Sequence, residues 1–89
     1  MRIWADPRPR FWTGVYRLYS TDGALLYVGV GVDPRNRVTE HIRRKPWGGE
    51  IADVVIDWYQ YIEVAHLAER RAIRDEKPLH NVIRYASAA

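Results

Sequence analysis

The sequence has no cysteine among its 89 residues. This absence excludes disulfide bonds, thiolate metal sites and catalysis by a thiol, and it makes a cytoplasmic location the default expectation. No apolar run approaches the roughly twenty residues of a membrane-spanning helix. The first residues also lack the apolar segment of a secretory signal peptide. We therefore expect a protein with no membrane partner.

A large excess of charge of one sign is also missing. The chain carries 14 basic and 11 acidic residues, a net charge of +3, so the distribution of charge matters more than its total. Residues 35–45 contain five basic residues and one acidic residue, and the candidates there for nucleic-acid binding are Arg35, Arg43, Arg44 and Lys45. A helix with this bias suits a DNA backbone, because each neutralised phosphate releases counterions. A solvated helix face explains the same pattern equally well.

The sequence does have enough apolar material for one small folded domain. Apolar residues make up 47% of the chain, and they include six tyrosines and four tryptophans. Such a composition is typical of a folded globule. We expect an extended arm at residues 1–12, one domain at residues 13–85 and a frayed end at residues 86–89. The basic, aromatic arm either packs its tryptophans on the domain or contacts nucleic acid.

Local signals predict a β-hairpin at the start of the domain. Two β-rich runs, residues 13–20 and 24–29, flank a turn that contains Asp22 and Gly23. Asp-Gly between such runs is typical of a hairpin, because glycine readily takes the positive φ that the turn needs.

Two helices and a third strand are expected after the hairpin. Asp33 is a favourable N-cap and Pro34 a favourable first helical residue, so a helix should cover residues 34–44. A β-branched and aromatic run predicts a strand at residues 54–60. A second helix should cover residues 63–76 before a proline stops it. The expected fold class is α+β, a small α/β domain whose three-stranded, mainly antiparallel sheet is flanked by helices.

The hairpin and the first helix carry side chains that suit phosphate chemistry. Tyr16 and Tyr27 lie on the two strands, and Arg37 and His41 lie one turn apart on the helix. A guanidinium binds phosphate oxygens through two parallel hydrogen bonds, and an imidazole donates to phosphate or moves a proton. Core packing also explains the tyrosines, and a hydrogen bond that anchors the helix also explains His41.

Arg37 and His41 flank an apolar pair, Val38 and Ile42, so they should line a cleft beside the packed face of the helix. The three histidines of the chain have no spacing typical of a zinc site, and without cysteines such a site is not expected.

Glu69 is the most informative residue of the second helix. At about 100° per residue, it lies in the middle of the apolar face formed by Ala65, Ala72 and Ile73. A carboxylate there costs desolvation free energy unless it meets a cation or hydrogen-bond donors. It either forms an internal ion pair, for example with Arg37, or is exposed by a rotated helix, or serves a functional site.

In this arrangement the sequence resembles the GIY-YIG endonuclease family. Gly14-Val15-Tyr16 stands at the GIY position and Tyr27-Val28-Gly29 at the YIG position, with valine in place of isoleucine in both. The other matching elements follow in the family's order: Arg37, His41, Glu69 and the Pro-Leu-His-Asn segment at residues 78–81. The resemblance covers residues 12–82, nearly the whole chain.

The resemblance implies a role for each matching residue. The family's general base stands at Tyr16, and Tyr27 corresponds to a phenol placed against the scissile phosphate or the attacking water; which phenol takes the proton stays open. Arg37 corresponds to the catalytic arginine, and His41 stands one turn later, where members carry His or Tyr. Glu69 matches the glutamate that binds a divalent cation, which would be Mg²⁺ or Mn²⁺, since Mg²⁺ suits a site with one protein carboxylate.

Supporting roles follow for three further residues. Asn81 matches an asparagine that braces the site by hydrogen bonds. Gly14 and Gly29 are interpreted as positions of backbone permissiveness near the site. After the YIG match many members carry Lys, Ser or Thr, whereas this chain has Val30 and Gly31. The corresponding polar contact is then either absent or made by a neighbouring arginine.

We therefore expect a metal-dependent endonuclease that hydrolyses DNA, with branched and single-stranded DNA among its substrates. The sequence shows no helix-turn-helix or zinc finger, so a targeting protein partner is one source of specificity. The alternatives are a non-catalytic nucleic-acid-binding module of the same fold and a small protein-interaction domain that uses exposed tryptophans.

Overall fold

A computed structural model describes residues 12–81 of the chain. The elements in chain order are β1 (Thr13–Tyr19), β2 (Leu25–Gly31), α1 (Pro34–Arg44), the 3-10 turn η1 (Gly48–Glu50), β3 (Asp53–Tyr59) and α2 (Ile62–Glu76). The three strands form one sheet in the order β2-β1-β3, and both neighbouring pairs are antiparallel. The expected α+β fold class is confirmed. Within residues 12–81, no helix has the length and apolar character needed to cross a membrane.

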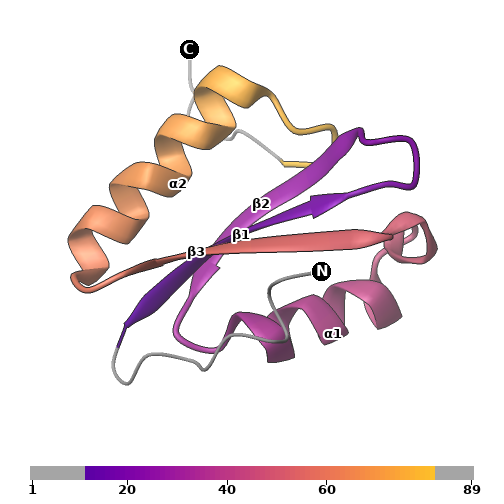
Figure 1. Ribbon diagram of the computed structural model, residues 1–89. Helices are drawn as coiled ribbons and strands as arrows, with labels where there is room; N and C mark the ends of the chain where they lie inside the picture. Colours follow the sequence, from indigo (N-terminus) through magenta and orange to yellow (C-terminus); the bar gives the residue numbers. More distant parts are fainter. Residues whose placement is uncertain (1–11, 82–89) are drawn as a thin grey trace, which may run out of the picture.

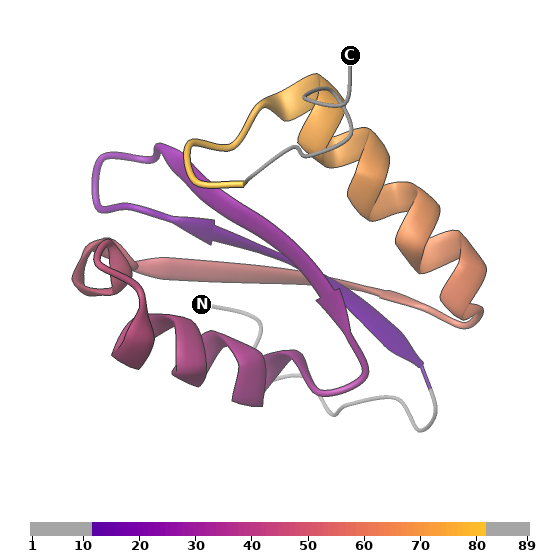
Figure 2. The same cartoon turned by 180° about the vertical axis from the view of Figure 1, so that it is seen from behind.

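The two helices cover opposite faces of the sheet (Figures 1 and 2). Each predicted element is present, with bounds within two residues of those expected. The expected arm, apart from Trp12, and the last residues of the chain, 82–89, lie outside the described part.

The hairpin turn forms as predicted, with Gly23 at φ 87°. Its N–H donates to the carbonyl oxygen of Ser20 at 3.0 Å, and the N–H of Ser20 donates to the carbonyl oxygen of Ala24 at 2.9 Å. Glycine is favoured here because a Cβ would meet the backbone at a positive φ.

A β-bulge in β2 places two consecutive side chains on the same face of the sheet. Leu18 pairs with Tyr27 and Tyr19 pairs with Leu25, so Leu26 is an extra residue without a partner opposite. Such an insertion shifts the alternation of side chains by one position. As a result Leu26 packs on the α1 face together with its neighbour Tyr27, whose own place beside Tyr16 follows from the regular pairing of Leu18 with Tyr27.

Each face of the sheet has its own hydrophobic core. The core on the α1 face comprises Tyr16, Leu18, Leu26, Val38, Trp47, Val54 and Ile56. The smaller core on the α2 face comprises Val15, Val28, Ala65 and Ala72. The division follows from strand geometry, since successive side chains point to opposite faces. Burial of a valine, leucine or isoleucine contributes about 1.5–3 kcal/mol to folding.

Helix α1 begins as the sequence predicts, with Asp33 at the N-cap position and Pro34 in the first turn, although the Asp33 side chain makes no capping hydrogen bond. A Cβ on Gly14 would lie 3.0 Å from Cγ of Pro34 and 2.9 Å from Cγ2 of Ile56. Gly14 therefore lets the start of α1 approach β1 closely.

One expectation for α1 is wrong. Val38 is buried as expected, but Ile42 is 47% exposed, and His41 occupies the buried face in its place. The packed stripe of α1 runs through Pro34, Val38 and His41, so Arg37 and His41 do not flank a buried Val38–Ile42 pair.

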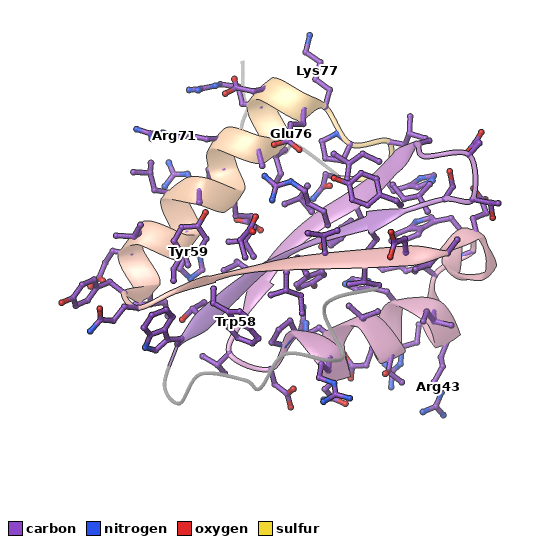
Figure 3. The ribbon with its side chains drawn as sticks, viewed as in Figure 1. Arg43, Trp58, Tyr59, Arg71, Glu76 and Lys77 are labelled. Atoms are coloured by element: carbon purple, nitrogen blue, oxygen red, sulfur yellow. The ribbon has the colours of Figure 1, made fainter. Side chains whose placement is uncertain are left out.

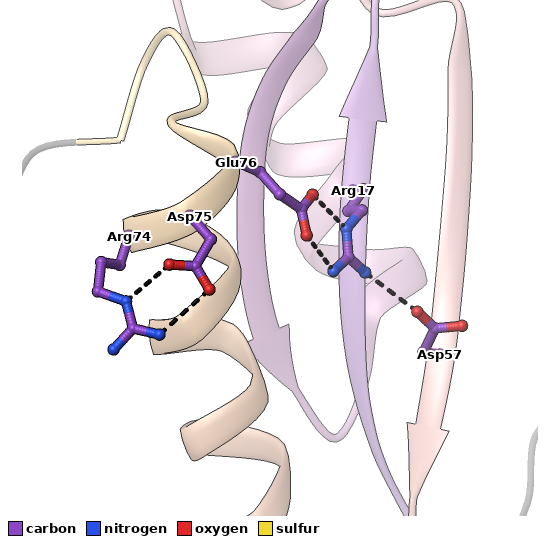
Figure 4. Close-up of polar contacts among 5 residues, drawn as sticks. All are labelled: Arg17, Asp57, Arg74, Asp75 and Glu76. Carbon is purple, nitrogen blue, oxygen red and sulfur yellow. Dashed lines mark hydrogen bonds and ion pairs between the residues drawn. The ribbon is translucent and has the colours of Figure 1, made fainter.

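Arg17 ties three elements together on the α2 face (Figure 4). Its guanidinium donates from Nε and Nη2 to the two carboxylate oxygens of Glu76 on α2, at 2.9 and 2.8 Å. Nη1 donates to Oδ2 of Asp57 on β3 at 3.0 Å. Paired hydrogen bonds of this kind fix orientation as well as charge, so Arg17 holds the end of α2 against the centre of the sheet.

The segment after α2 returns to the outer edge of β2. Backbone N–H groups of Leu79 and His80 donate to the carbonyl oxygens of Leu25 and Leu26, at 3.1 and 2.9 Å. This pairing covers part of an edge strand that would otherwise present unpaired backbone groups.

Candidate active site

Tyr16 lies at the centre of the site, over a glycine of the neighbouring strand. Tyr16 on β1 is 1% exposed and pairs directly with Gly29 on β2. A Cβ on Gly29 would overlap the phenol ring and hydroxyl of Tyr16. Neither Gly14 nor Gly29 has a positive φ. The interpretation of both as conformationally permissive positions is therefore wrong, because each is needed for space.

The hydroxyl of Tyr16 forms a buried hydrogen bond with His41 on α1. The distance from the phenol oxygen to Nε2 is 3.0 Å, and His41 is 6% exposed. Burial, together with the charges of Lys45 and Arg37, lowers the pKa of His41 below 6.5. The imidazole is therefore neutral at pH 7, and with its proton on Nδ1 it accepts the hydrogen bond from the phenol at Nε2.

Both phenols are harder to ionise than free tyrosine. Burial and the neighbouring Tyr27 raise the pKa of Tyr16 to about 12, while the adjacent Arg37 guanidinium opposes the rise. Burial and the charge of Glu69 raise the pKa of Tyr27, and Arg37 again opposes the rise. At neutral pH each hydroxyl keeps its proton, so neither is a ready-made base in the free protein.

Arg37 is exposed and belongs to α1. Its positive charge lowers the pKa of both phenols. Tyr16 in turn raises the pKa of Arg37. The guanidinium is therefore close enough for its charge to affect both hydroxyl groups while it remains exposed to solvent. An arginine in this position can bind two phosphate oxygens at once.

Tyr27 and His41 pack against each other and against the ring of Trp47. The ring centroid of Tyr27 lies 4.6 Å from that of His41 and 5.6 Å from that of Trp47. Trp47 is 8% exposed and stacks on His80 with a centroid distance of 4.8 Å and an interplanar angle of 2°. Sequence reasoning missed both Trp47 and His80, because nothing in the sequence shows that these rings meet.

Glu69 lies half-buried on α2, which covers the face of the sheet opposite α1 and the two phenols (Figure 1). Burial raises the pKa of its carboxyl, and the charges of His66 and Arg70 lower it part of the way. Its own charge raises the pKa of both Tyr16 and Tyr27. Within residues 12–81 Glu69 forms no hydrogen bond or ion pair, so the alternative of a pair with Arg37 is not observed.

The residues present fit a single divalent cation better than a multi-ligand metal centre. In the described part of the chain, no group of three His, Cys, Asp or Glu side chains is arranged to hold a metal ion. Mg²⁺ keeps several waters and is often bound by one or two carboxylates plus substrate phosphates. Glu69, a desolvated carboxylate without a partner among residues 12–81, has the chemistry of such a ligand.

Asn81 braces the strand that carries Tyr27. Its Oδ1 accepts a hydrogen bond from the N–H of Val28 and its Nδ2 donates to the Val28 carbonyl oxygen, both at 2.9 Å. The side chain therefore pairs with β2 as a backbone peptide would. This matches the expected supporting contact by hydrogen bonds.

The basic residues of α1 are exposed but do not share one face. Arg35, Arg43, Arg44 and Lys45 are all exposed. At 3.6 residues per turn, Arg44 lies about 20° from Arg37 around the helix axis, whereas Arg43 lies about 120° away. Figure 3 shows Arg43 pointing away from the sheet. The structure thus groups Arg44 with the site and separates Arg43 from it.

A hollow of about 330 Å³ lies between α2 and β3, away from these residues. It is lined by apolar side chains of α2 together with Tyr59, Arg71 and Glu76, which Figure 3 labels. It contains no predicted catalytic residue.

Comparison with protein-family models, curated proteins and solved structures found no match to this chain.

Proposed function

We propose that this protein is a metal-dependent endonuclease that hydrolyses DNA phosphodiester bonds, of the GIY-YIG type that its motifs resemble. The observation that carries the proposal is the buried hydrogen bond between Tyr16 and His41, with Arg37 beside it. A phenol, a neutral imidazole and an exposed guanidinium at one point suit attack on a phosphate.

The phenol acts as a proton relay. A stable phenolate is unfavourable at a pKa of about 12. A concerted transfer avoids it: the attacking water gives its proton to the oxygen of Tyr16, while the hydroxyl proton of Tyr16 passes to Nε2 of His41. The water oxygen forms the new bond to phosphorus, and the bond to the leaving oxygen breaks; that oxygen keeps the bonding electrons and takes a proton from solvent water. His41 finishes as an imidazolium.

Arg37 and Glu69 supply the electrostatics. Arg37 binds the phosphate oxygens and stabilises the charge that grows on them in the transition state. Glu69 holds a divalent cation, Mg²⁺ or Mn²⁺, which supplies Lewis-acid stabilisation of the phosphate and leaving oxygen.

DNA is the proposed partner, and α1 is the surface proposed to meet it. Arg44 and Lys45 extend the positive surface from Arg37 along the helix, which suits a phosphate backbone. Branched and single-stranded DNA are included among the proposed substrates. A targeting protein partner and a cytoplasmic location complete the proposal.

One observation favours a second candidate, a nucleic-acid-binding module that does not cut. The exposed basic residues of α1 need no catalytic group to bind DNA. The third reading, interaction through exposed tryptophans, has less support in the described residues, where Trp12 is exposed, Trp58 is partly buried and Trp47 is buried.

A nicking assay separates these functions. The full chain is incubated with supercoiled, branched and single-stranded DNA in Mg²⁺, Mn²⁺ or EDTA. We expect cleavage with either cation and none in EDTA. Tyr16→Phe and Glu69→Gln should abolish cleavage but keep DNA binding, whereas Glu63→Gln, an exposed carboxylate on the same helix, should change neither. Undiminished cleavage in EDTA would exclude the metal role, and salt-dependent binding without cleavage would favour the second candidate.

A further inference from the structure

His66 lies three residues before Glu69 on α2. Side chains three apart on a helix are neighbours, with Cβ atoms about 5–6 Å apart. On this helix the direction of His66 differs from that of Glu69 by about 60° around the axis. In helical di-metal carboxylate proteins a glutamate and a histidine at this spacing both bind metal, although there the glutamate comes first.

Neither side chain is engaged elsewhere in the described part of the chain. His66 is exposed and Glu69 is half-buried, and within residues 12–81 neither forms a hydrogen bond or an ion pair. The two groups are close, because His66 is the first of the charges that act on the Glu69 carboxyl. The imidazole can therefore turn toward the carboxylate without breaking a hydrogen bond or ion pair to another of the residues 12–81.

We propose that His66 is a second protein ligand of the divalent cation held by Glu69, and that this makes the site selective for Mn²⁺ over Mg²⁺. The inference rests on the proposed function, because Glu69 is its metal-binding residue. Mg²⁺ takes oxygen ligands and retains its waters. Sites with nitrogen ligands bind the first-row divalent metals, a series that begins with Mn²⁺, whereas Mg²⁺ is bound through oxygen.

A simpler role for His66, that of a neighbouring positive charge, makes the opposite prediction. A charge near Glu69 opposes every cation, so its removal would tighten Mg²⁺ and Mn²⁺ alike. Loss of a ligand would weaken Mn²⁺ and leave Mg²⁺ unchanged. Arg70 provides the matched control, since it also acts on the Glu69 carboxyl but cannot bind a metal.

The first test is calorimetric titration of the full chain with Mn²⁺ and with Mg²⁺, without DNA. We expect His66→Gln to weaken Mn²⁺ binding at least about tenfold, the smallest effect usual for metal-site partners, without change for Mg²⁺. Arg70→Gln should leave the ratio of the two affinities unaltered, and Glu69→Gln should abolish both. An unchanged Mn²⁺ affinity in His66→Gln, or no Mn²⁺ binding by the wild-type chain at millimolar concentrations, would overturn the proposal.

The second test is NMR of the histidine rings. Substoichiometric Mn²⁺, which is paramagnetic, should broaden the ring signals of His66 before those of His80, which stacks on Trp47. Equal broadening of the two would overturn the assignment. Both readouts are independent of cleavage. If the chain cuts DNA but His66→Gln binds Mn²⁺ normally, this inference fails while the endonuclease stands. If His66-dependent Mn²⁺ binding occurs without cleavage, this inference stands and the proposed endonuclease activity fails.

Discussion

Tyr16 occupies the space above residue 29 because that residue has no side chain. In a Gly29→Ala variant the added methyl group overlaps the phenol ring, so the ring must move and its hydrogen bond to His41 must break. We expect a loss of about 1–3 kcal/mol in the free energy of unfolding, the usual cost of overpacking, and loss of nicking.

Gly49→Ala is the matched control for this substitution. A Cβ at Gly49 meets no atom within 4 Å, so stability and nicking should stay at the wild-type level. Thermal melts of both variants provide the measurement. Equal melting temperatures for Gly29→Ala and Gly49→Ala would contradict the tight contact between Tyr16 and β2.

Glu69→Ala separates a metal ligand from a structural ion pair. In EDTA the folded protein holds a desolvated carboxylate without a partner among the described residues, and burial raises its pKa above 4.5. The ionised group therefore opposes folding at neutral pH, so alanine, the best helix former, should leave the melting temperature unchanged or raise it. Cleavage should disappear. A structural pair would instead lose about 3–5 kcal/mol.

The pH dependence of the Glu69→Ala effect on stability follows from the raised pKa of Glu69. As pH falls through the raised pKa of Glu69, the folded protein takes up a proton and the unfavourable charge is removed. Any advantage of Glu69→Ala should therefore shrink in acid. The control is Glu63→Ala, which removes an acid from the first turn of α2 and should lower the melting temperature, because an acid there favours the helix dipole. A lower melting temperature for Glu69→Ala at pH 7 would contradict the expectation.

At the scale of the elements, α1 has two basic flanks that should contribute unequally to DNA binding. Arg44 lies on the flank of Arg37, about 20° away, whereas Arg43 lies about 120° away. If Arg44 contacts a duplex phosphate, Arg44→Gln should weaken binding to all sequences and reduce the salt slope by about one unit. Arg43→Gln should have a smaller effect on both. Measurement of Kd from 50 to about 200 mM salt tests this; equal slopes for the two variants would place the DNA on another face of α1.

The bounds of the elements could be predicted from the sequence because neighbours in the chain set them. Gly23 permits the turn, and Pro34 favours the first turn of α1. The bulge at Leu26 could not be predicted, because it depends on how β1 and β2 pair. That bulge brings Leu26 into the core on the α1 face, beside Tyr27.

The candidate site, too, could be predicted from the sequence only in part. The residue types and their spacing could be predicted, since Tyr16, Tyr27, Arg37 and His41 lie within one hairpin and the helix that follows it. The contacts that hold them could not be predicted. Trp47, for example, stacks on His80 only because the segment after α2 returns along β2. The free-energy cost of adding a side chain at Gly29 likewise depends on the packed structure.

At the scale of the whole molecule, both helices depend on the sheet, and α2 is fastened to it by charge. Arg17 and Glu76 are separated by 59 positions in the chain and make two hydrogen bonds, and Asp57 adds a third. Arg17 retains 19% exposure, so the pairs are partly shielded from solvent. This is the contact between β1, β3 and α2 that local sequence signals could not predict.

Arg17→Met keeps most of the side-chain stem but removes these bonds. We expect it to cost about 1 kcal/mol of the free energy of unfolding, since both carboxylates are partly exposed and solvent screens the pairs. Asp75→Asn, which removes the exposed pair between Arg74 and Asp75, should leave the melting temperature unchanged. The two variants separate a shielded ion pair from an exposed one on the same helix.

The pH dependence of this contact shows whether Arg17 stabilises the protein through its charge. Arg17 lowers the pKa of Glu76 below its ordinary value of 4.5. Stabilisation by the pair is therefore complete above that value and is lost as pH falls through the pKa of Glu76 in the folded protein. The melting temperatures of wild type and Arg17→Met should differ most at neutral pH and converge in acid, and salt should narrow the gap because Glu76 is 40% exposed. A gap that stays constant from pH 7 into the acid range would show that Arg17 acts through packing of its stem and not through its charge.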